Sequence, residues 1–250
     1  MKLARTLAAA LAFFGALVGA ASAQSRVDLE LVLAVDVSRS IDEEEAKLQR
    51  EGYVAAFLSP QVQRAVASGQ IGKIAVAYIE WADYYYVREV VPWTLIDGPE
   101  SARRFAERLA AEPYISGFRT SISAAIDAGA KMIRENAYEG TRKVIDVSGD
   151  GPNNSGRPVE TARDEAVAQG ITINGLAIVN DRWTGNFPPP ANLDIYYEKN
   201  VIGGPDAFML VAEDFKTFGT AILNKLIKEI ALAPEPPSGT RHAPARFAGP

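Results

Sequence analysis

The feature that most limits how this chain can fold is an alternation of apolar runs and amphipathic segments between about residues 27 and 230. The first run, Leu29–Val35, is almost entirely apolar, which is typical of a central strand covered on both faces. Residues 41–58 follow it with apolar side chains at helical spacing. Because strands that alternate with helices form mostly parallel sheets, we predict an α/β, Rossmann-like fold. Its doubly wound, mostly parallel sheet would carry helices on both faces.

The remaining segments continue this alternation. The predicted further strands are residues 73–81, 84–91, 143–147, 171–178 and 207–211. The predicted further helices are residues 99–110, from Thr120 or Ser121 to about 136, 159–169, and one capped by Asp214 that runs to about 230. Only the Ala82-Asp83 corner separates the second and third strands, so these two should form an antiparallel hairpin. One antiparallel strand would then lie at an edge of the sheet.

The N-terminus has the pattern of a cleaved secretory signal. A short basic start is followed by an apolar run from about Leu7 to Ala20, and then by Ala-Ser-Ala, which ends at Ala23. The alternative is a membrane anchor, but the apolar run is shorter than the roughly 20 residues that span a bilayer. We therefore expect a periplasmic or secreted protein without a stable membrane anchor. The predicted organisation is a signal peptide at 1–23, one domain at 24–231, and a disordered, proline-rich tail at 232–250.

Composition excludes several kinds of site. The chain has no cysteine, which excludes disulfides, a thiolate nucleophile and cysteine-ligated zinc. Its single histidine, His242, lies in the predicted tail, so a Ser-His-Asp triad or a histidine-rich metal site is not expected. The formal net charge is −5, without the basic surface that nucleic-acid binding needs. We therefore predict no nucleic-acid partner.

Oxygen-bearing side chains gather where three segments should end at one edge of the sheet. Asp36, Ser38 and Ser40 follow the first strand, Thr120 precedes a helix, and Asp150 follows the strand KVIDVS. In an extended turn, alternate residues point to one side, so the first three can face one ion. Two carboxylates and three hydroxyls, without nitrogen or sulfur, suit Mg²⁺ or Ca²⁺ better than zinc or copper.

This combination of Asp-x-Ser-x-Ser, a lone Thr and Asp-Gly resembles the metal-ion-dependent adhesion site of a von Willebrand factor A (vWA) domain. The resemblance covers about residues 27–230, and VIDVSGDGPNN and EWADYYY…VVPW are similar to a group of exported bacterial vWA-like proteins of undefined function. It implies Mg²⁺ as the cofactor, with Ca²⁺ or Mn²⁺ as alternatives. It also implies that Ser38, Ser40 and Thr120 contact the metal directly, whereas Asp36 and Asp150 contact it largely through water.

A simpler interpretation of the same residues is local structure. The three hydroxyls could cap helices, and Asp150-Gly151 could be an ordinary turn. Five suitable residues in three segments, in the right topological order, favour the metal site. The implied function is a non-enzymatic binding module in which the metal bridges to an Asp or Glu of a protein partner.

Two other functions remain open. The first is a metal-dependent phosphohydrolase of the haloacid dehalogenase type, which needs a second Asp where this chain has Ser38, and a general base that the sequence does not supply. The second is a purely structural protein with a vestigial site. The sequence leaves the oligomeric state undetermined.

Residues outside the metal set could select the partner. Arg39 lies between two predicted ligands, and the segment 180–194 contains Asp181, Trp183 and Phe187. Long irregular connections are usually functional or disordered, so we expect this segment to flank the metal. The alternative is that it packs down as a lid-like cover.

Three further groups of residues have structural interpretations that we favour. Asp146, inside a predicted buried strand, should have a structural partner. The acids at 42–45 should cap a helix. The aromatic residues should be cross-strand packing rather than a sugar platform; they are Trp81, Tyr84, Tyr85, Tyr86 and Trp93.

Overall fold

The computed structural model describes residues 24–179, 183, 188–213 and 217–231, and shows one six-stranded sheet. Its strands, in the order β3-β2-β1-β4-β5-β6, are β1 (Ser25–Asp36), β2 (Ile74–Trp81), β3 (Val87–Ile96), β4 (Tyr138–Gly149), β5 (Thr172–Ile178) and β6 (Met209–Ala212). Neighbouring strands are parallel except β2 and β3. The predicted sheet, with its antiparallel edge strand, is confirmed. The predicted signal peptide and tail lie outside the described residues.

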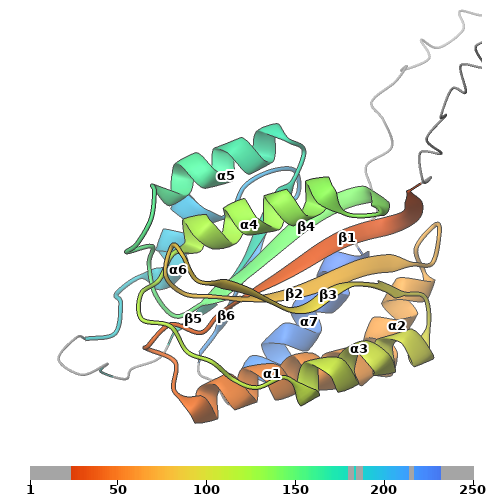
Figure 1. Cartoon of the computed structure of the whole chain (residues 1–250), viewed down its shortest axis with the longest axis horizontal. Coiled ribbons are helices and arrows are strands. Elements are labelled where there is room, and N and C mark those ends of the chain that lie inside the picture. The colour runs from red at the N-terminus through yellow and green to blue at the C-terminus, as the bar shows by residue number, and fades with distance from the viewer. Residues whose placement is uncertain (1–23, 180–182, 184–187, 214–216, 232–250) are drawn as a thin grey trace, which may run out of the picture.

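Helices cover both faces of the sheet (Figure 1). One face carries α1 (Glu43–Leu58), α2 (Pro60–Ala67), α3 (Pro99–Ala111) and α7 (Phe218–Ala231), and the other carries α4 (Ile122–Glu135), α5 (Val159–Ala168), α6 (Leu193–Tyr196) and the π-helix η1 (Tyr197–Val201). In β1, Leu31 and Leu33 enter the core under α1 and α7, whereas Val32 and Ala34 enter the core under α4 and α5. The first apolar run is therefore a central strand covered on both faces, as predicted.

Several element boundaries differ from the prediction. β3 begins at Val87 rather than at residue 84, because the residues before it form the hairpin turn. It also continues to Ile96, past Pro92, which lies opposite a register shift between Val76 and Tyr78 on an edge strand, where proline is tolerated. β4 begins earlier than predicted, at Tyr138, and pairs there with the start of β1. The helix α2, which starts after the Ser59 cap, was not predicted.

The topology creates a binding edge. From β1 the chain continues to β2 on one side, while from β4 it continues to β5 on the other, and β1 and β4 are neighbours. In open α/β sheets, ligands bind beyond the carboxyl ends of the strands at such a reversal of order. The residues that follow Asp36 and Gly149 therefore share one crevice. None of the helices in the described part of the chain is long and apolar enough to span a membrane.

Candidate metal centre

The turn after β1 gathers the first three candidate ligands. Asp36, the last residue of β1, is fully buried, and its Oδ1 accepts the backbone N–H of Ser38 at 2.7 Å. The hydroxyls of Ser38 and Ser40 are hydrogen-bonded at 3.0 Å. The alternate residues of this turn therefore do point to one side, as the spacing predicted.

The other two candidate ligands lie against this turn. Ser40 Oγ donates to Asp150 Oδ1 at 2.6 Å, which joins the loops after β1 and β4. Thr120 is buried, and a Cβ placed on Gly151 would lie 3.6 Å from its Oγ1. The structure thus brings all five predicted residues together from three segments. Their roles as metal ligands stay a prediction.

The structure also tests the alternative that the three hydroxyls cap helices. The N-cap of α1 is Asp42, whose side chain accepts the N–H of Glu45 while the Glu45 side chain accepts the N–H of Asp42. The N-cap of α4 is Ser121, one residue after Thr120. Capping of these two helices therefore does not account for the hydroxyls of Ser38, Ser40 and Thr120. The expectation that the acids at 42–45 cap a helix is confirmed.

Two asparagines hold the Thr120 segment in place. The Thr120 N–H donates to Asn154 Oδ1 at 3.0 Å, and the Asn154 N–H donates to the Thr120 carbonyl at 2.8 Å. Asn153 Oδ1 accepts the N–H of Ser123 at 3.0 Å. Because these bonds tie the loop after Asp150 to the start of α4, the asparagines fix Thr120 next to the Asp-Gly pair. Sequence reasoning missed this role, although GPNN directly follows Asp150.

The electrostatics of the cluster favour a cation. Burial raises the pKa of Asp36 well above its ordinary value, and the negative charge of Asp150 raises it further. Asp36 Oδ2 is buried and has no hydrogen-bond partner among the residues described. A divalent cation would relieve both the repulsion and the unsatisfied oxygen. The donor set therefore fits a hard ion of the Mg²⁺ class, which is commonly held by one or two carboxylates.

This site is not an acid-rich one. The described part of the chain contains no group of three or more His, Cys, Asp or Glu side chains that could hold a metal ion. Hydroxyls supply the other oxygens here, so the cluster depends on neutral ligands beside two carboxylates. Neutral ligands leave a cation able to accept an external carboxylate.

A buried tyrosine reaches the floor of the cluster and was not predicted. Tyr197, the first residue of η1, is fully buried and its hydroxyl has no hydrogen-bond partner in the part of the chain described. A Cβ on Gly149 would lie 2.9 Å from both this hydroxyl and Asp36 Oδ2. Glycine at this position therefore lets the two polar groups approach one another. No sequence motif marks Tyr197, because tertiary packing places it there.

The predicted partner-binding residues have mixed outcomes. Arg39 is exposed, as a partner-binding role requires, and Trp183 is 66% exposed. Asp181 and Phe187 lie outside the residues that the structure describes.

The prediction for the aromatic residues is wrong for two of them. Trp81 is buried in the core and Trp93 is partly buried, with its Nε1 donating to the Met132 carbonyl at 3.3 Å. Tyr84 and Tyr85, by contrast, are 64% and 70% exposed. They occupy the hairpin turn rather than a strand, so they have no cross-strand neighbour to pack against.

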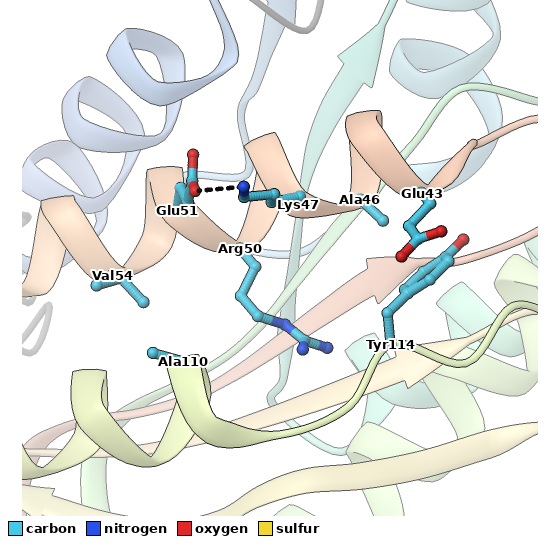
Figure 2. A pocket seen from close by; sticks show the side chains of 8 residues that line it. All are labelled: Glu43, Ala46, Lys47, Arg50, Glu51, Val54, Ala110 and Tyr114. Carbon is cyan, nitrogen blue, oxygen red and sulfur yellow. Dashed lines mark ion pairs between the residues drawn. The ribbon is translucent and has the colours of Figure 1, made fainter.

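A separate pocket lies between α1 and the end of α3. It has a volume of about 320 Å³ and contains none of the candidate ligands; Figure 2 shows its lining, Glu43, Ala46, Lys47, Arg50, Glu51, Val54, Ala110 and Tyr114. Tyr114 Oη donates to the Ile41 carbonyl at 3.1 Å, immediately after the Ser40 turn. Arg50 pairs with the buried Glu80. Tyr114 therefore links this pocket to the residue after the Ser40 turn, but the pocket is separate from the candidate metal site.

Comparison with known proteins places the chain in a family. A family model described as "Protein of unknown function (DUF1194)" matches residues 26–234. The chain belongs to this family. No curated protein matches the chain. The match covers every helix described here and the sheet from the second residue of β1 onward.

Solved structures show which fold this is. Similar structures include proximal thread matrix protein 1 from the mussel byssus (TM-score 0.55, 17% identity), the pilus adhesin SpaC from Lactobacillus rhamnosus GG (0.58, 14%) and a von Willebrand factor type A protein from Catenulispora acidiphila (0.53, 13%). They match 83%, 83% and 82% of this chain, which covers 49%, 31% and 42% of theirs. This DUF1194 chain therefore has a vWA-like α/β fold, as the sequence resemblance implied, and spans less than half of each of those proteins.

Proposed function

We propose that this chain is an exported, metal-dependent protein-binding module of the adhesion type. The observation that carries the proposal is the contact between the two loops at the sheet reversal, where Ser40 Oγ donates to Asp150 Oδ1. This contact brings two buried carboxylates and three hydroxyls into one oxygen-only cluster. Mg²⁺ suits that donor set best, with Ca²⁺ or Mn²⁺ as alternatives. The partner is a protein that presents an Asp or Glu.

The five candidate ligands would contribute two kinds of oxygen atom. Ser38, Ser40 and Thr120 supply neutral oxygens, while Asp36 and Asp150 supply the negative charge. A bound divalent cation would supply an electrophilic centre with a position open to an external carboxylate. The hydrogen bond from the Thr120 N–H to Asn154 Oδ1 fixes the position of the third hydroxyl relative to the other two.

Structural relatives support the proposal at the level of fold. The mussel protein was solved with zinc in its metal-ion-dependent adhesion site, and SpaC is a pilus adhesin. Metal binding and adhesion are therefore both found among proteins with this architecture. The choice of Mg²⁺ for this chain rests on its oxygen donors and not on those proteins.

No specific observation favours the phosphohydrolase alternative. The position two residues after Asp36 is Ser38, whose hydroxyl lies 3.0 Å from the Ser40 hydroxyl. A hydrolase of that kind uses a second carboxylate there. We therefore do not propose an enzymatic function.

Calorimetric titration with Mg²⁺ tests the site. We expect the Thr120→Val and Asp36→Asn variants to bind Mg²⁺ about tenfold more weakly or worse, because each loses a donor. Thr220→Val, an exposed threonine in α7, is the matched control and should bind like the wild type. Equal affinity for all four proteins would show that the cluster is not a metal site.

A pull-down from periplasmic extract tests the adhesion function. We expect a partner that is retained in Mg²⁺, released by EDTA and lost with Thr120→Val. A partner retained equally under all three conditions would contradict a metal bridge. Turnover of a generic phosphoester that disappears with Asp36→Asn would instead support the hydrolase.

Export can be tested separately. The predicted cleavage after Ala23 would leave Gln24 as the first residue of the mature chain. Intact mass measurement of protein recovered from a periplasmic fraction would verify this. A full-length mass in the cytoplasmic fraction would contradict it.

A further inference from the structure

Three of the four most exposed large apolar side chains in the described part of the chain lie on segments that contact the metal centre. Phe118, Tyr85, Trp183 and Tyr84 are 73%, 70%, 66% and 64% exposed. Tyr84 and Tyr85 lie in the turn between β2 and β3, and Phe118 lies two residues before Thr120. A local concentration of exposed aromatic residues indicates an interaction site.

The contacts between these loops define one surface, which we call the aromatic rim: Tyr84, Tyr85, Ile115 and Phe118. The hydroxyl of Tyr86 in the hairpin turn donates to the Ile115 carbonyl at 3.1 Å. The buried carboxylate of Asp83 accepts the N–H of Phe118 at 3.2 Å. The hairpin turn therefore fixes the backbone of the segment that carries Ile115 and Phe118.

The aromatic rim is joined to the metal centre by backbone contacts. The Gly117 N–H donates to the Val37 carbonyl at 2.8 Å, inside the Asp36–Ser40 turn. A Cβ on Gly117 would lie only 2.2 Å from the Cβ of Ala82, so glycine permits this close approach. The rim segment thus lies between the hairpin turn and the first metal loop, and a ligand on the metal would meet both.

Two arginines accompany this surface. Arg39 lies between Ser38 and Ser40, and Arg119 lies between Phe118 and Thr120; both are exposed, and neither side chain pairs with any residue that the structure describes. Exposed acids follow Arg39 in the first turn of α1. The segment 114–121 contains no acid, so Arg119 is the cation available to a partner's carboxylate. Arginine and aromatic residues are the types that most often anchor protein interfaces.

We propose that this face binds an acidic polypeptide segment, with one carboxylate at the metal, a second paired with Arg119, and an apolar side chain packed on the aromatic rim. The inference rests on the proposed function for the first carboxylate only. The rings of Tyr84 and Tyr85 are nearly perpendicular, with an interplanar angle of 85°. A sugar ring stacks on a flat aromatic face, so this geometry and the aliphatic Ile115 favour a side chain over a saccharide.

Selection from a displayed library of random linear peptides, with the immobilised chain in Mg²⁺, tests the inference. We expect enriched peptides to contain two acidic residues next to an aromatic or aliphatic one. The best of them should bind Arg119→Gln and Tyr85→Ser about tenfold more weakly than the wild type. The matched controls are Arg64→Gln in α2 and Leu58→Ser in α1, both exposed and at the other end of the molecule, and they should bind like the wild type.

The outcomes separate this inference from the proposed function. Enriched peptides could bind only in Mg²⁺, carry a single acid, and bind Arg119→Gln as tightly as the wild type. That result would overturn the inference and leave the adhesion function intact. Enriched peptides that lack acids, or that EDTA does not release, would overturn both. Failure to enrich any peptide, or binding of an oligogalacturonate probe in place of peptides, would also overturn the inference. Calorimetry with Mg²⁺ on Arg119→Gln should show unchanged metal affinity, which confirms that the variant folds.

Discussion

At the scale of single residues, the candidate site depends on how closely oxygen atoms can approach. Asp36 is buried with one oxygen bonded to the Ser38 N–H and the other unsatisfied. Such an arrangement is costly for a carboxylate without a counterion. The same closeness makes small residues essential, because a methyl group in the wrong place displaces an oxygen. Gly149 is the clearest example.

Replacement of Gly149 by alanine should weaken metal binding. The new Cβ would lie 2.9 Å from Asp36 Oδ2 and from the Tyr197 hydroxyl, so one of these groups must move. We expect Mg²⁺ affinity to fall by about tenfold to a hundredfold, as measured by calorimetric titration. Gly98→Ala is the control, since a Cβ there meets nothing within 4 Å. Unchanged affinity in Gly149→Ala would show that Asp36 is not placed for a metal.

At the scale of elements, α7 is tied to the sheet by a buried ion network. Lys225 Nζ lies 2.6 Å from Asp146 Oδ1 on β4 and 2.5 Å from Glu229 Oε1 one turn along α7. Asn174 on β5 donates to the same Glu229 oxygen at 3.1 Å. All these side chains are buried. The expectation that Asp146 has a structural partner is confirmed, and the network sets the position of α7 over the strands that lead to the metal loops.

Removal of the lysine should loosen α7. Lys225→Met leaves the carboxylates of Asp146 and Glu229 buried without their cation, which costs about 3 kcal/mol or more of unfolding free energy. Urea unfolding monitored by circular dichroism measures the loss. Lys228→Met, on the exposed side of the same helix, should cost less than about 1 kcal/mol. Similar losses for the two variants would argue that the network does not anchor the helix.

At the scale of the whole molecule, two buried acids make stability depend on pH. Burial, followed by the charge of Glu229, raises the pKa of Asp146 to about 7 despite the opposing charge of Lys225. Burial and Asp150 raise the pKa of Asp36 in the same direction. A raised pKa means that the folded state retains a proton that the unfolded state has already released. Stability should therefore fall as pH rises from the ordinary aspartate range toward about 7.

This pH dependence can be measured on the metal-free protein. Unfolding free energies from urea titrations between about pH 5 and 7 should fall by up to about 1.4 kcal/mol per pH unit for each such proton. In Asp146→Asn the contribution of that residue is absent, so the slope should be shallower. A slope of the opposite sign, or one unchanged by the substitution, would contradict the raised pKa of Asp146.

Metal should also stabilise the molecule as a whole. A ligand that binds only the folded state at about 100 times its Kd adds about 2.7 kcal/mol, which for a domain of this size raises Tm by roughly 5 to 10 °C. Thermal unfolding with Mg²⁺ and then with excess EDTA would show the shift and its reversal. Asp36→Asn should show no shift. An equal shift in that variant would mean that the ion binds elsewhere.

Periodicity and local chemistry determined the fold class and most of the site. The almost entirely apolar Leu29–Val35 run specified a central strand, because only burial on both faces accommodates it. The polar residues after this run indicated that the strand ends in a turn that carries the hydroxyls of Ser38 and Ser40. These features depend on neighbouring residues, so the sequence shows them directly.

Only the tertiary structure decided which distant groups meet. Ser40 and Asp150 are 110 positions apart, yet their side chains are hydrogen-bonded because β1 and β4 are adjacent. The same packing places the Tyr197 hydroxyl under Asp36, pairs Lys225 with Asp146, and leaves Tyr84 exposed on a turn. Such contacts carry no local pattern, because each depends on the register and order of strands that the whole core sets.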